Sequence, residues 1–507
     1  MVYILGIDIG TSGTKTALFD YKGNVKASYT EEYELLSPSN GYAEQHPEDW
    51  WNATVHGIKE VIYKSGINSA DIKGIGLSGQ MHGLVMLDEK NEVIRNAIIW
   101  CDQRTAKECD EITEKVGKER LIEITANPAL TGFTASKILW VKNNEPRNYE
   151  RCKHILLPKD YIRFKLTGEY ATEVSDASGM QLLDIKNRCW SDEVLSKLGI
   201  DKNLLGKVYE SPDVTGEITQ QVADITGLTK GTIVAGGAGD NAAAAVGTGV
   251  VEDGRAFTTI GTSGVVFVHT SKMVIDPLGR VHTFCAAVPN SWHVMGVTQA
   301  AGLSLKWFKD NFCHEEMEIS KNTNKYIYDI TDDLARNVPI GSDKLLYLPY
   351  LMGERTPHLD PYARGVFMGL SAIHNKSNMI RAILEGVSFS LNDCKSVFAE
   401  MGIFFDDMMV CGGGAKSDLW RQMLADIYST PVTTLGSSEG PAMGVAILAA
   451  VASGVYKNVS EACTEIVKKD ITQKPILENT ELYNKYYNVY KKVYLDLKDT
   501  YKTLNSL

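Results

Sequence analysis

The chain has 507 residues, of which 44% are hydrophobic, and its 52 basic and 63 acidic side chains give a formal net charge of −11. This length exceeds what one hydrophobic core usually serves, so we expect two domains, and the acidic balance argues against nucleic acid or an anionic membrane surface as the main partner. Nine cysteines without a Cys-x-x-Cys pair, and the lack of a long apolar run or a signal peptide, predict a cytoplasmic protein with no zinc site and no membrane span.

The first motif is Gly-Thr-Ser-Gly at residues 10–13, between β-branched runs that predict strands at 2–9 and 16–19. Its small residues leave backbone N–H groups and hydroxyls open to phosphate oxygens. Asp8 ends the first strand beside this turn, where a carboxylate either holds magnesium near the phosphates or caps the turn. Lys15, in the returning strand, either meets phosphate or is a solvated strand lysine.

The rest of the first half alternates strands with helices, which is a mixed α/β pattern. Hydrophobic runs bounded by turn residues predict the strands, and longer stretches with helical start signals predict the helices. The expected strands lie at 75–78, 85–87, 97–100 and 232–235, and the expected helices at 47–64, 134–143 and 241–246.

A polar loop, Ser-Gly-Gln-Met-His-Gly, occupies residues 78–83 between two of these strands. Gln80 and His82 carry groups that hydrogen-bond hydroxyls, and Met81 can pack on the apolar face of a sugar. A sugar site needs this mixture of a few placed polar groups and apolar surface. The alternative for His82, taken alone, is a structural histidine. A similar polar set follows the strand at 97–100, in Trp-Cys-Asp-Gln-Arg.

A glycine-rich turn, Gly-Gly-Ala-Gly-Asp at 236–240, joins the strand at 232–235 to a helix of small residues. The small neighbours let a ligand approach the carboxylate of Asp240. A buried carboxylate at such a turn can act as general base toward a hydroxyl. The alternative is an aspartate that caps the helix.

Gly-Thr-Ser-Gly returns at 261–264, again between apolar runs that predict strands, at 256–260 and 265–268. Two matching hairpins half a chain apart predict two related domains that face one another across a shared phosphate site. We place these domains at residues 1–250 and 251–507.

The second half repeats the α/β style, with strands expected at 345–348 and 408–411 and helices at 299–310, 376–401 and 417–428. The glycine run at 411–417 lacks the P-loop pattern, although a glycine turn before a helix can hold a nucleotide. Tyrosines near the C-terminus follow a helical spacing, which favours a stripe packed on the domain surface over an aromatic ligand box. The stripe contains Tyr483, Tyr486, Tyr487, Tyr490, Tyr494, Leu497 and Tyr501.

Two longer patterns, at 132–144 and at 365–385, resemble the two signatures of the carbohydrate-kinase family named after its Phe-Gly-Gly-Tyr motif. The resemblance covers nearly the whole chain. It implies two ribonuclease-H-like domains of the actin/hexokinase superfamily with a central cleft, ATP and Mg²⁺ as cofactors, and a homodimer.

The resemblance also implies a role for each candidate residue. Asp240 would be the catalytic base on the sugar hydroxyl, and Asp8 would hold the magnesium. The sugar would be bound by Gln80, Met81, His82, Asp102 and Asn241; the first phosphate loop would be lined by Thr11, Ser12, Thr14 and Lys15, the second by Thr262; and the nucleotide would lie along Gly302, Gly413 and Ser417.

The loops at 78–83, 353–358 and 411–422 are most similar to those of family members that phosphorylate D-xylulose, so the resemblance implies D-xylulose 5-phosphate as product, in xylose catabolism. Glycerol kinases carry Arg-Glu at positions 81 and 82, which argues against glycerol. The alternatives are a kinase for another ketose or polyol, such as L-ribulose or a pentitol, and a sugar-sensing ATPase on the same fold.

Two positions depart from the family's pattern. Lys306 falls where glycerol kinase has a glutamine that contacts the nucleotide, so that contact is not carried over. Cys101 stands where asparagine is expected, which leaves a sugar contact at that position open.

Overall fold

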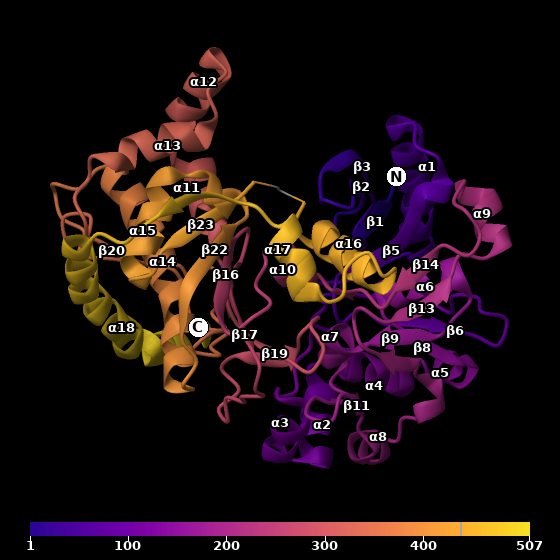
Figure 1. Cartoon of the computed structure of the whole chain (residues 1–507). Coiled ribbons are helices and arrows are strands. Elements are labelled where there is room, and N and C mark those ends of the chain that lie inside the picture. Colours follow the sequence, from indigo (N-terminus) through magenta and orange to yellow (C-terminus); the bar gives the residue numbers. More distant parts are fainter. Residues whose placement is uncertain (437–438) are drawn as a thin grey trace.

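Two mixed seven-stranded sheets form the centres of the two halves of the chain in the computed structural model, which describes residues 1–436 and 439–507 (Figure 1). The first sheet runs, edge to edge, β13 (Val214–Glu217), β14 (Ile233–Ala235), β5 (Ile72–Gly79), β1 (Tyr3–Ile9), β2 (Gly13–Asp20) and β3 (Val25–Glu32), with β15 (Ala238–Gly239) also beside β5. The second runs β18 (His282–Cys285), β19 (Trp292–Thr298), β17 (Gly264–Thr270), β16 (Gly254–Ile260), β22 (Phe405–Cys411), β23 (Val432–Leu435) and β24 (Lys469–Gln473).

Five strands repeat between the sheets. The order β3-β2-β1-β5-β14 in the first half corresponds to β19-β17-β16-β22-β23 in the second. In each case a hairpin of two antiparallel strands, β1–β2 or β16–β17, is followed by two parallel neighbours. The predicted pair of related α/β domains is therefore confirmed, and each Gly-Thr-Ser-Gly motif forms the turn of the equivalent hairpin.

Helices cover these sheets, and short two-stranded ribbons extend them. In the first half the helices are α1 (Pro47–Ser65), α2 (Ala106–Val116), α3 (Lys118–Thr125), α4 (Thr134–Asn144), α5 (Pro146–Arg151), α6 (Pro158–Thr167), α7 (Val174–Ala177), α8 (Asp192–Leu198), α9 (Gln220–Thr226) and α10 (Asp240–Gly247). In the second they are α11 (Gly302–Phe312), α12 (His314–Thr323), α13 (Ile327–Arg336), α14 (Lys376–Glu400), α15 (Asp418–Tyr428), α16 (Gly440–Ala452), α17 (Val459–Ile466) and α18 (Leu477–Asn505). The ribbons pair β4 (Glu44–Gln45) with β7 (Ala97–Ile98), β6 (Val85–Leu87) with β8 (His154–Leu156), β9 (Ala171–Glu173) with β12 (Lys207–Tyr209), β10 (Leu183–Asp184) with β11 (Cys189–Trp190), and β20 (Leu346–Leu348) with β21 (Val366–Met368).

For two of the predicted elements, a hydrogen bond explains why the boundary in the structure differs from the expected one. The strand expected at 97–100 ends at Ile98, because the chain turns there and the Asp102 N–H donates to the carbonyl of Ile99. The helix expected from 299 begins at Gly302, because the backbone N–H of Gln299 donates to the Glu354 carboxylate instead of entering a helix.

The chain returns to the first half after residue 439. Helix α16 packs on β1 and β5 and on α10, so a segment from the second half becomes part of the first core (Figure 1). Glycines allow this close approach: a Cβ on Gly76 would overlap the carbonyl oxygen of Val445, and one on Gly444 would overlap that of Ala243. The two halves are thus joined by a second connection that does not depend on the chain near residue 250.

Substitution of Gly76 by alanine is expected to lower the free energy of unfolding by about 3 kcal/mol or more, because the added methyl group meets a backbone carbonyl that cannot move without shifting α16. Gly436→Ala is the matched control, since a Cβ there meets only ordinary van der Waals contacts. Urea unfolding of the two variants measures the difference. Equal stabilities would show that α16 does not pack on β5 at backbone distance.

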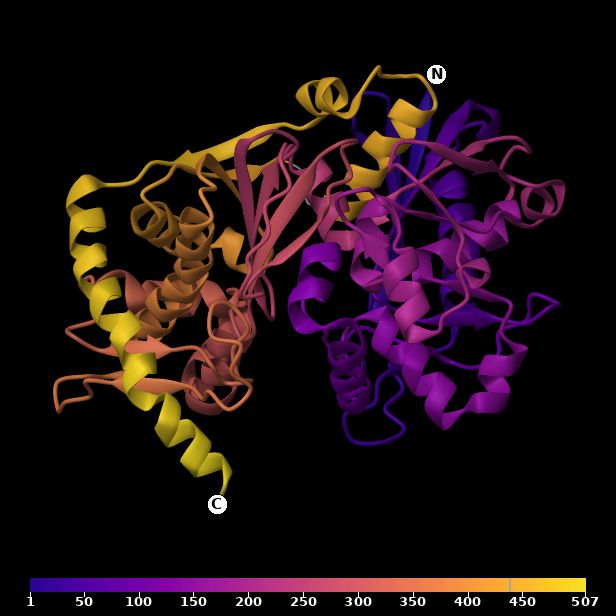
Figure 2. The same ribbon diagram turned by 90° about the horizontal axis from the view of Figure 1, so that it is seen from below.

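The predicted tyrosine stripe packs on the second half through α18, which lies along its outer side (Figure 2). Its hydroxyls reach buried partners: Tyr487 donates to Asp393 over 2.6 Å and Tyr494 to Asp360 over 2.9 Å. Burial raises the pKa of Asp393 to about 7. The packing prediction is confirmed for Tyr483, Tyr487, Tyr490, Tyr494 and Tyr501, which are buried, while Tyr486 and Leu497 are half-buried.

None of the helices in the described part of the chain has the length and apolar character that crossing a bilayer requires.

Candidate active site

The turn of the first hairpin brings Asp8 into the site. Asp8 lies opposite Lys15 in the β1–β2 register, and the Gly10 N–H donates to the Gly13 carbonyl to close the turn. The Asp8 side chain is half-buried, and its Oδ1 atom is buried without a hydrogen-bond partner among the described residues. Burial raises the pKa of Asp8, an effect that Ser78 and Lys15 partly offset. An oxygen of this kind suits a hard cation such as Mg²⁺.

Asp240 is the first residue of α10. Its Oδ1 accepts from the backbone N–H and the side-chain amide of Asn241, at 2.7 and 3.0 Å, and Gly239 rather than Asp240 occupies the N-cap. Asp240 is therefore not the N-cap residue, although its carboxylate accepts from a first-turn N–H of α10. Burial and the charge of Asp8 raise the pKa of Asp240 to about 7, so the two carboxylates share one site. A half-exposed carboxyl that titrates near neutrality can take a proton from a hydroxyl.

His82 is neutral and offers one acceptor. Its Nδ1 lies 2.8 Å from the carbonyl oxygen of Gly179, so Nδ1 carries the hydrogen and Nε2 keeps a free lone pair. Burial and the charge of Lys137 lower the pKa of His82 to about 3. Thus His82 has a structural hydrogen bond on one nitrogen and an acceptor for a ligand hydroxyl on the other.

Gln80 and Met81, which precede this histidine, are both buried. The Met81 side chain packs against Gly239, where a Cβ would contact its Cγ and Sδ. The Gln80 amide is buried and used at both ends: Nε2 donates to Gln45 over 2.8 Å, and Oε1 accepts from Thr11 over 3.4 Å. Gln80 therefore links the first turn to the strand β4, and Met81 packs beside the Asp240 turn.

Asp102 is fully buried, and both of its carboxylate oxygens are engaged. Arg104 donates to Oδ1 and Oδ2, and the backbone N–H of Ala43 donates to Oδ2 over 2.6 Å. This arrangement favours a structural role over the predicted sugar contact.

Lys15 forms an ion pair rather than being solvated. Its Nζ lies 2.9 Å from Oε2 of Glu439, the residue that precedes α16. Thr14 is buried in the same strand, with its hydroxyl 3.4 Å from that of Tyr33, while Thr11 is half-buried and Ser12 exposed at the tip of the turn. The turn therefore presents Thr11 and Ser12, and Lys15 connects it to the α16 segment.

The predicted nucleotide residues come together in the second half. A cavity of about 200 Å³ lies beside the second hairpin turn, and Thr262, Gly302, Gly413 and Ser417 all line it. The Ser417 hydroxyl also caps α15, accepting from the Trp420 N–H over 3.0 Å.

Other residues of this cavity were not predicted. Tyr326 and Tyr328 line it, and aromatic rings of this kind can stack on a nucleobase. They come from the start of α13, where no glycine signature marks a ligand. Lys306 also lines the cavity and pairs with Asp310 over 2.6 Å.

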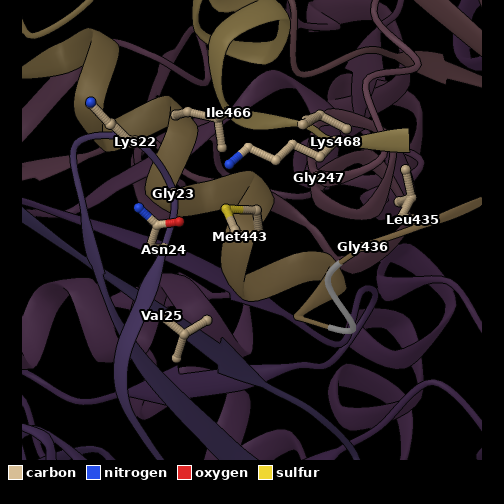
Figure 3. Close-up of a pocket in the computed structure, with 11 residues that line it drawn as sticks. Lys22, Gly23, Asn24, Val25, Gly247, Leu435, Gly436, Met443, Ile466 and Lys468 are labelled. Carbon is tan, nitrogen blue, oxygen red and sulfur yellow. The ribbon is translucent and has the colours of Figure 1, made fainter. Parts of the chain in front are cut away.

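A different cavity, of about 250 Å³, lies between the β2–β3 turn and α16–α17 and contains none of the predicted site residues (Figure 3). Its wall is mainly apolar, with Met443 and Ile466 between the exposed Lys22 and Lys468. The candidate active site therefore consists of the β1–β2 turn and the β16–β17 turn, one in each half, together with the loops beside them that carry the predicted residues.

Comparisons with known proteins agree with this division. Residues 3–247 match the N-terminal domain of the FGGY family of carbohydrate kinases, and residues 256–453 match its C-terminal domain. The xylulose kinase of Bacillus subtilis is 41% identical over 506 residues, which cover 100% of this chain and 99% of that protein.

Solved structures match over the same length. A xyloylose kinase from Brucella ovis superimposes with a TM-score of 0.91 at 34% identity, covering 98% of this chain and 100% of that one. A gluconate kinase from Lactobacillus acidophilus does so with a TM-score of 0.92 at 28% identity, covering 99% of each chain.

Proposed function

Because this chain belongs to the FGGY family of carbohydrate kinases, we propose that it transfers the γ-phosphate of ATP to the terminal hydroxyl of D-xylulose, giving D-xylulose 5-phosphate. Its full-length relatives at 37% to 41% identity are xylulose kinases, which supports this substrate. The observation that carries the proposal is that Met81 packs against Gly239, which brings the Met81–His82 loop beside Asp240.

In the proposed mechanism the sugar lies against the first half, with a hydroxyl donating to Nε2 of His82 and an apolar face on Met81. Asp240 orients the attacking O5 hydroxyl and accepts its proton, because its carboxyl is half-exposed and titrates near neutrality. The side-chain amide of Asn241 donates to Oδ1 of Asp240 and so holds the carboxylate in place. Phosphoryl transfer then depends mainly on positioning and on charge neutralisation.

Two turns would bind the phosphates. Thr11 and Ser12 of the first turn and Thr262 of the second offer hydroxyls and backbone N–H groups, and the nucleotide would extend along Gly302, Gly413 and Ser417. Thr14 is buried in β2, so it would support the first turn rather than contact phosphate. Asp8 would hold Mg²⁺, which when bound neutralises phosphate charge. Lys15 would reach phosphate only by leaving Glu439, its ion-pair partner.

The turn that carries Asp240 is held by a buried polar network. Ser175 Oγ accepts from the Gly239 N–H over 3.1 Å and donates to Glu173 over 2.9 Å. Glu173 in turn lies 3.3 Å from Nζ of Lys159. At the other end of the turn, Arg163 donates to the carbonyl of Gly236.

Ser175→Ala is expected to lower kcat about 10- to 100-fold with little change in the KM for ATP, because the base loses its fixed position. Ser211→Ala is the matched control: Ser211 is also buried and also donates to Glu173, over 2.8 Å, but no hydrogen bond joins it to Gly239. Steady-state kinetics and melting temperatures of both variants separate the effects. Equal losses of kcat would mean that the network acts only on stability.

The product identifies the reaction directly. After incubation with MgATP and D-xylulose, phosphorus–proton correlation by NMR is expected to place the phosphate on carbon 5. A phosphate on another carbon, or no sugar phosphate, would refute the proposal.

A second candidate is phosphorylation of another sugar. It is favoured by the gluconate kinase that shares the fold over 99% of this chain. A panel of acceptor sugars distinguishes the two. Cytoplasmic location and a homodimer remain predictions; light scattering after gel filtration measures the second.

A further inference from the structure

Arg355 is a charged side chain without a carboxylate partner, placed between the two halves of the molecule. It follows β20 in the Gly-Glu-Arg-Thr-Pro-His segment of the second half. Within residues 1–436 and 439–507, Arg355 forms no ion pair, and its side chain donates one hydrogen bond, from Nη1 to Nε2 of His282 over 3.4 Å. A guanidinium has five N–H donors, so most of them have no protein acceptor.

The neighbouring Glu354 acts on the guanidinium through its charge but makes no direct ion pair with it: burial lowers the pKa of Arg355, and the charge of Glu354 partly offsets that effect. The Glu354 carboxylate is buried and is already used by the Thr298 hydroxyl at 2.6 Å, the Gln299 N–H at 3.1 Å and the backbone N–H of Arg355 at 2.7 Å. These bonds hold the carboxylate toward the interior of the second half. The carboxylate therefore makes no hydrogen bond to the guanidinium of Arg355.

A chain of hydrogen bonds across the interface between the halves orients Arg355. The Asn127 amide donates to the carbonyls of Thr125 and Thr283, which fixes its Oδ1 as an acceptor for Nδ1 of His282 at 2.7 Å. His282 therefore carries its hydrogen on Nδ1 and can only accept at Nε2, where Arg355 donates. Asn127 belongs to the first half, whereas His282 and Arg355 belong to the second.

The same chain of hydrogen bonds places Arg355 near His82, the proposed hydrogen-bond acceptor for the sugar. The ring centroids of His82 and Phe133 lie 4.7 Å apart. The centroid of Phe133 lies 5.8 Å from that of His282 and 6.1 Å from that of Phe284. The positive charge of Arg355 contributes to the lowered pKa of both His82 and His282, after the larger effect of burial. The guanidinium thus shares one aromatic wall with His82, and its side chain is half-exposed there.

We propose that Arg355 is a sugar-binding residue contributed by the second half, which donates N–H groups to oxygens of the ketose held by His82. This inference rests on the proposed function. The half-exposed guanidinium keeps N–H donors that the protein does not use, and a ketose supplies carbonyl and hydroxyl oxygens for a planar fork of donors. His82 accepts from the sugar and Arg355 donates to it, so the two residues fix its orientation from opposite halves.

A consequence is that sugar binding ties the halves together. Asn127 acts as a positioning residue, because it orients Arg355 only through His282 and only when the halves are in contact. Bound sugar would therefore favour the closed arrangement that brings the phosphate turns to Asp240, and water alone would not.

The test compares Arg355→Met and Arg355→Lys with the wild-type protein by isothermal titration and kinetics. Both variants are expected to raise the Kd and KM for D-xylulose about 10- to 100-fold, the usual effect of losing a hydrogen bond to a charged group. The Kd for a non-hydrolysable ATP analogue is expected to stay within about twofold, since the nucleotide cavity does not include this residue. Arg280→Met is the matched control, because Arg280 lies on the same half but pairs with Asp276 and Glu400.

A measurement on the unaltered protein covers the case in which the variants do not fold. Phenylglyoxal modifies accessible arginines, and peptide mass spectrometry locates the label. D-xylulose is expected to protect Arg355 and to leave Arg280 unchanged. Sugar affinity within twofold of wild type in Arg355→Met, or unchanged labelling of Arg355 in saturating sugar, would overturn the inference alone. Failure of the wild-type protein to bind or phosphorylate D-xylulose would overturn the proposed function and this inference with it.

Discussion

Replacement of Asp240 by asparagine is expected to lower kcat by about 10² to 10⁴ while D-xylulose still binds. The amide keeps an oxygen at the position that accepts from Asn241, so the turn retains its hydrogen bonds. It cannot take the proton of the attacking hydroxyl. The proposed sugar contacts at Met81, His82 and Arg355 are left in place by the substitution.

The pH profile gives a second readout of the same residue. Because the pKa of Asp240 is raised to about 7 by burial and by the charge of Asp8, the wild-type kcat/KM is expected to fall as the pH drops below about 7, where the base is protonated. The asparagine variant should lack this acid limb. Asp224→Asn, on the exposed side of α9, is the control for the substitution itself. Near-normal turnover in Asp240→Asn would remove Asp240 from the role of base.

Asp8→Asn is expected to lower kcat by about 10² to 10³, the scale of losing one electrostatic stabiliser of the transition state. The buried Oδ1 of Asp8 has no protein partner among the described residues, which fits a ligand for Mg²⁺. The concentration of Mg²⁺ that gives half-maximal activity should therefore rise.

This variant also moves the pKa of Asp240. The negative charge of Asp8 helps to raise that pKa, so removing the charge should lower it and shift the acid limb of the residual activity to lower pH. Titration of activity against Mg²⁺ and against pH measures both effects. If the limb and the Mg²⁺ requirement both stayed unchanged, Asp8 would not share a site with Asp240.

Local sequence signals predicted much of the fold. The β-branched runs on either side of each Gly-Thr-Ser-Gly motif correspond to strands on both sides of a tight turn, β1–β2 and β16–β17. Such hairpins are determined within about 20 residues, and the equal spacing of polar and apolar positions in both copies was enough to predict two related halves.

Features that depend on distant contacts were not predicted. The packing of α16 on the first sheet depends on glycines such as Gly76 and Gly444, which meet only in three dimensions. Arg104 lies close to Asp102 in the sequence, but the backbone N–H of Ala43, which completes the hydrogen bonding of its carboxylate, lies 59 positions away. The ion pair of Lys15 likewise involves a residue more than 400 positions away.

The site was predicted unevenly for the same reason. Asp240, Met81 and His82 follow strands closely and carry recognisable chemistry, so short motifs were enough to select them as candidates. Tyr326 and Tyr328 reach the second cavity from a helix start without such a motif. Arg355 belongs to a motif, but its orientation depends on His282 and on Asn127 of the other half.

The specificity constant for a panel of acceptors tests the central claim most directly. ADP release with MgATP should be measured with D-xylulose, L-ribulose, D-ribulose, glycerol, gluconate and no sugar. We predict that kcat/KM for D-xylulose exceeds that for every other acceptor by at least about tenfold, and that release without sugar is slight. A higher value for another acceptor would contradict D-xylulose as the substrate, and release that does not depend on any sugar would contradict a kinase.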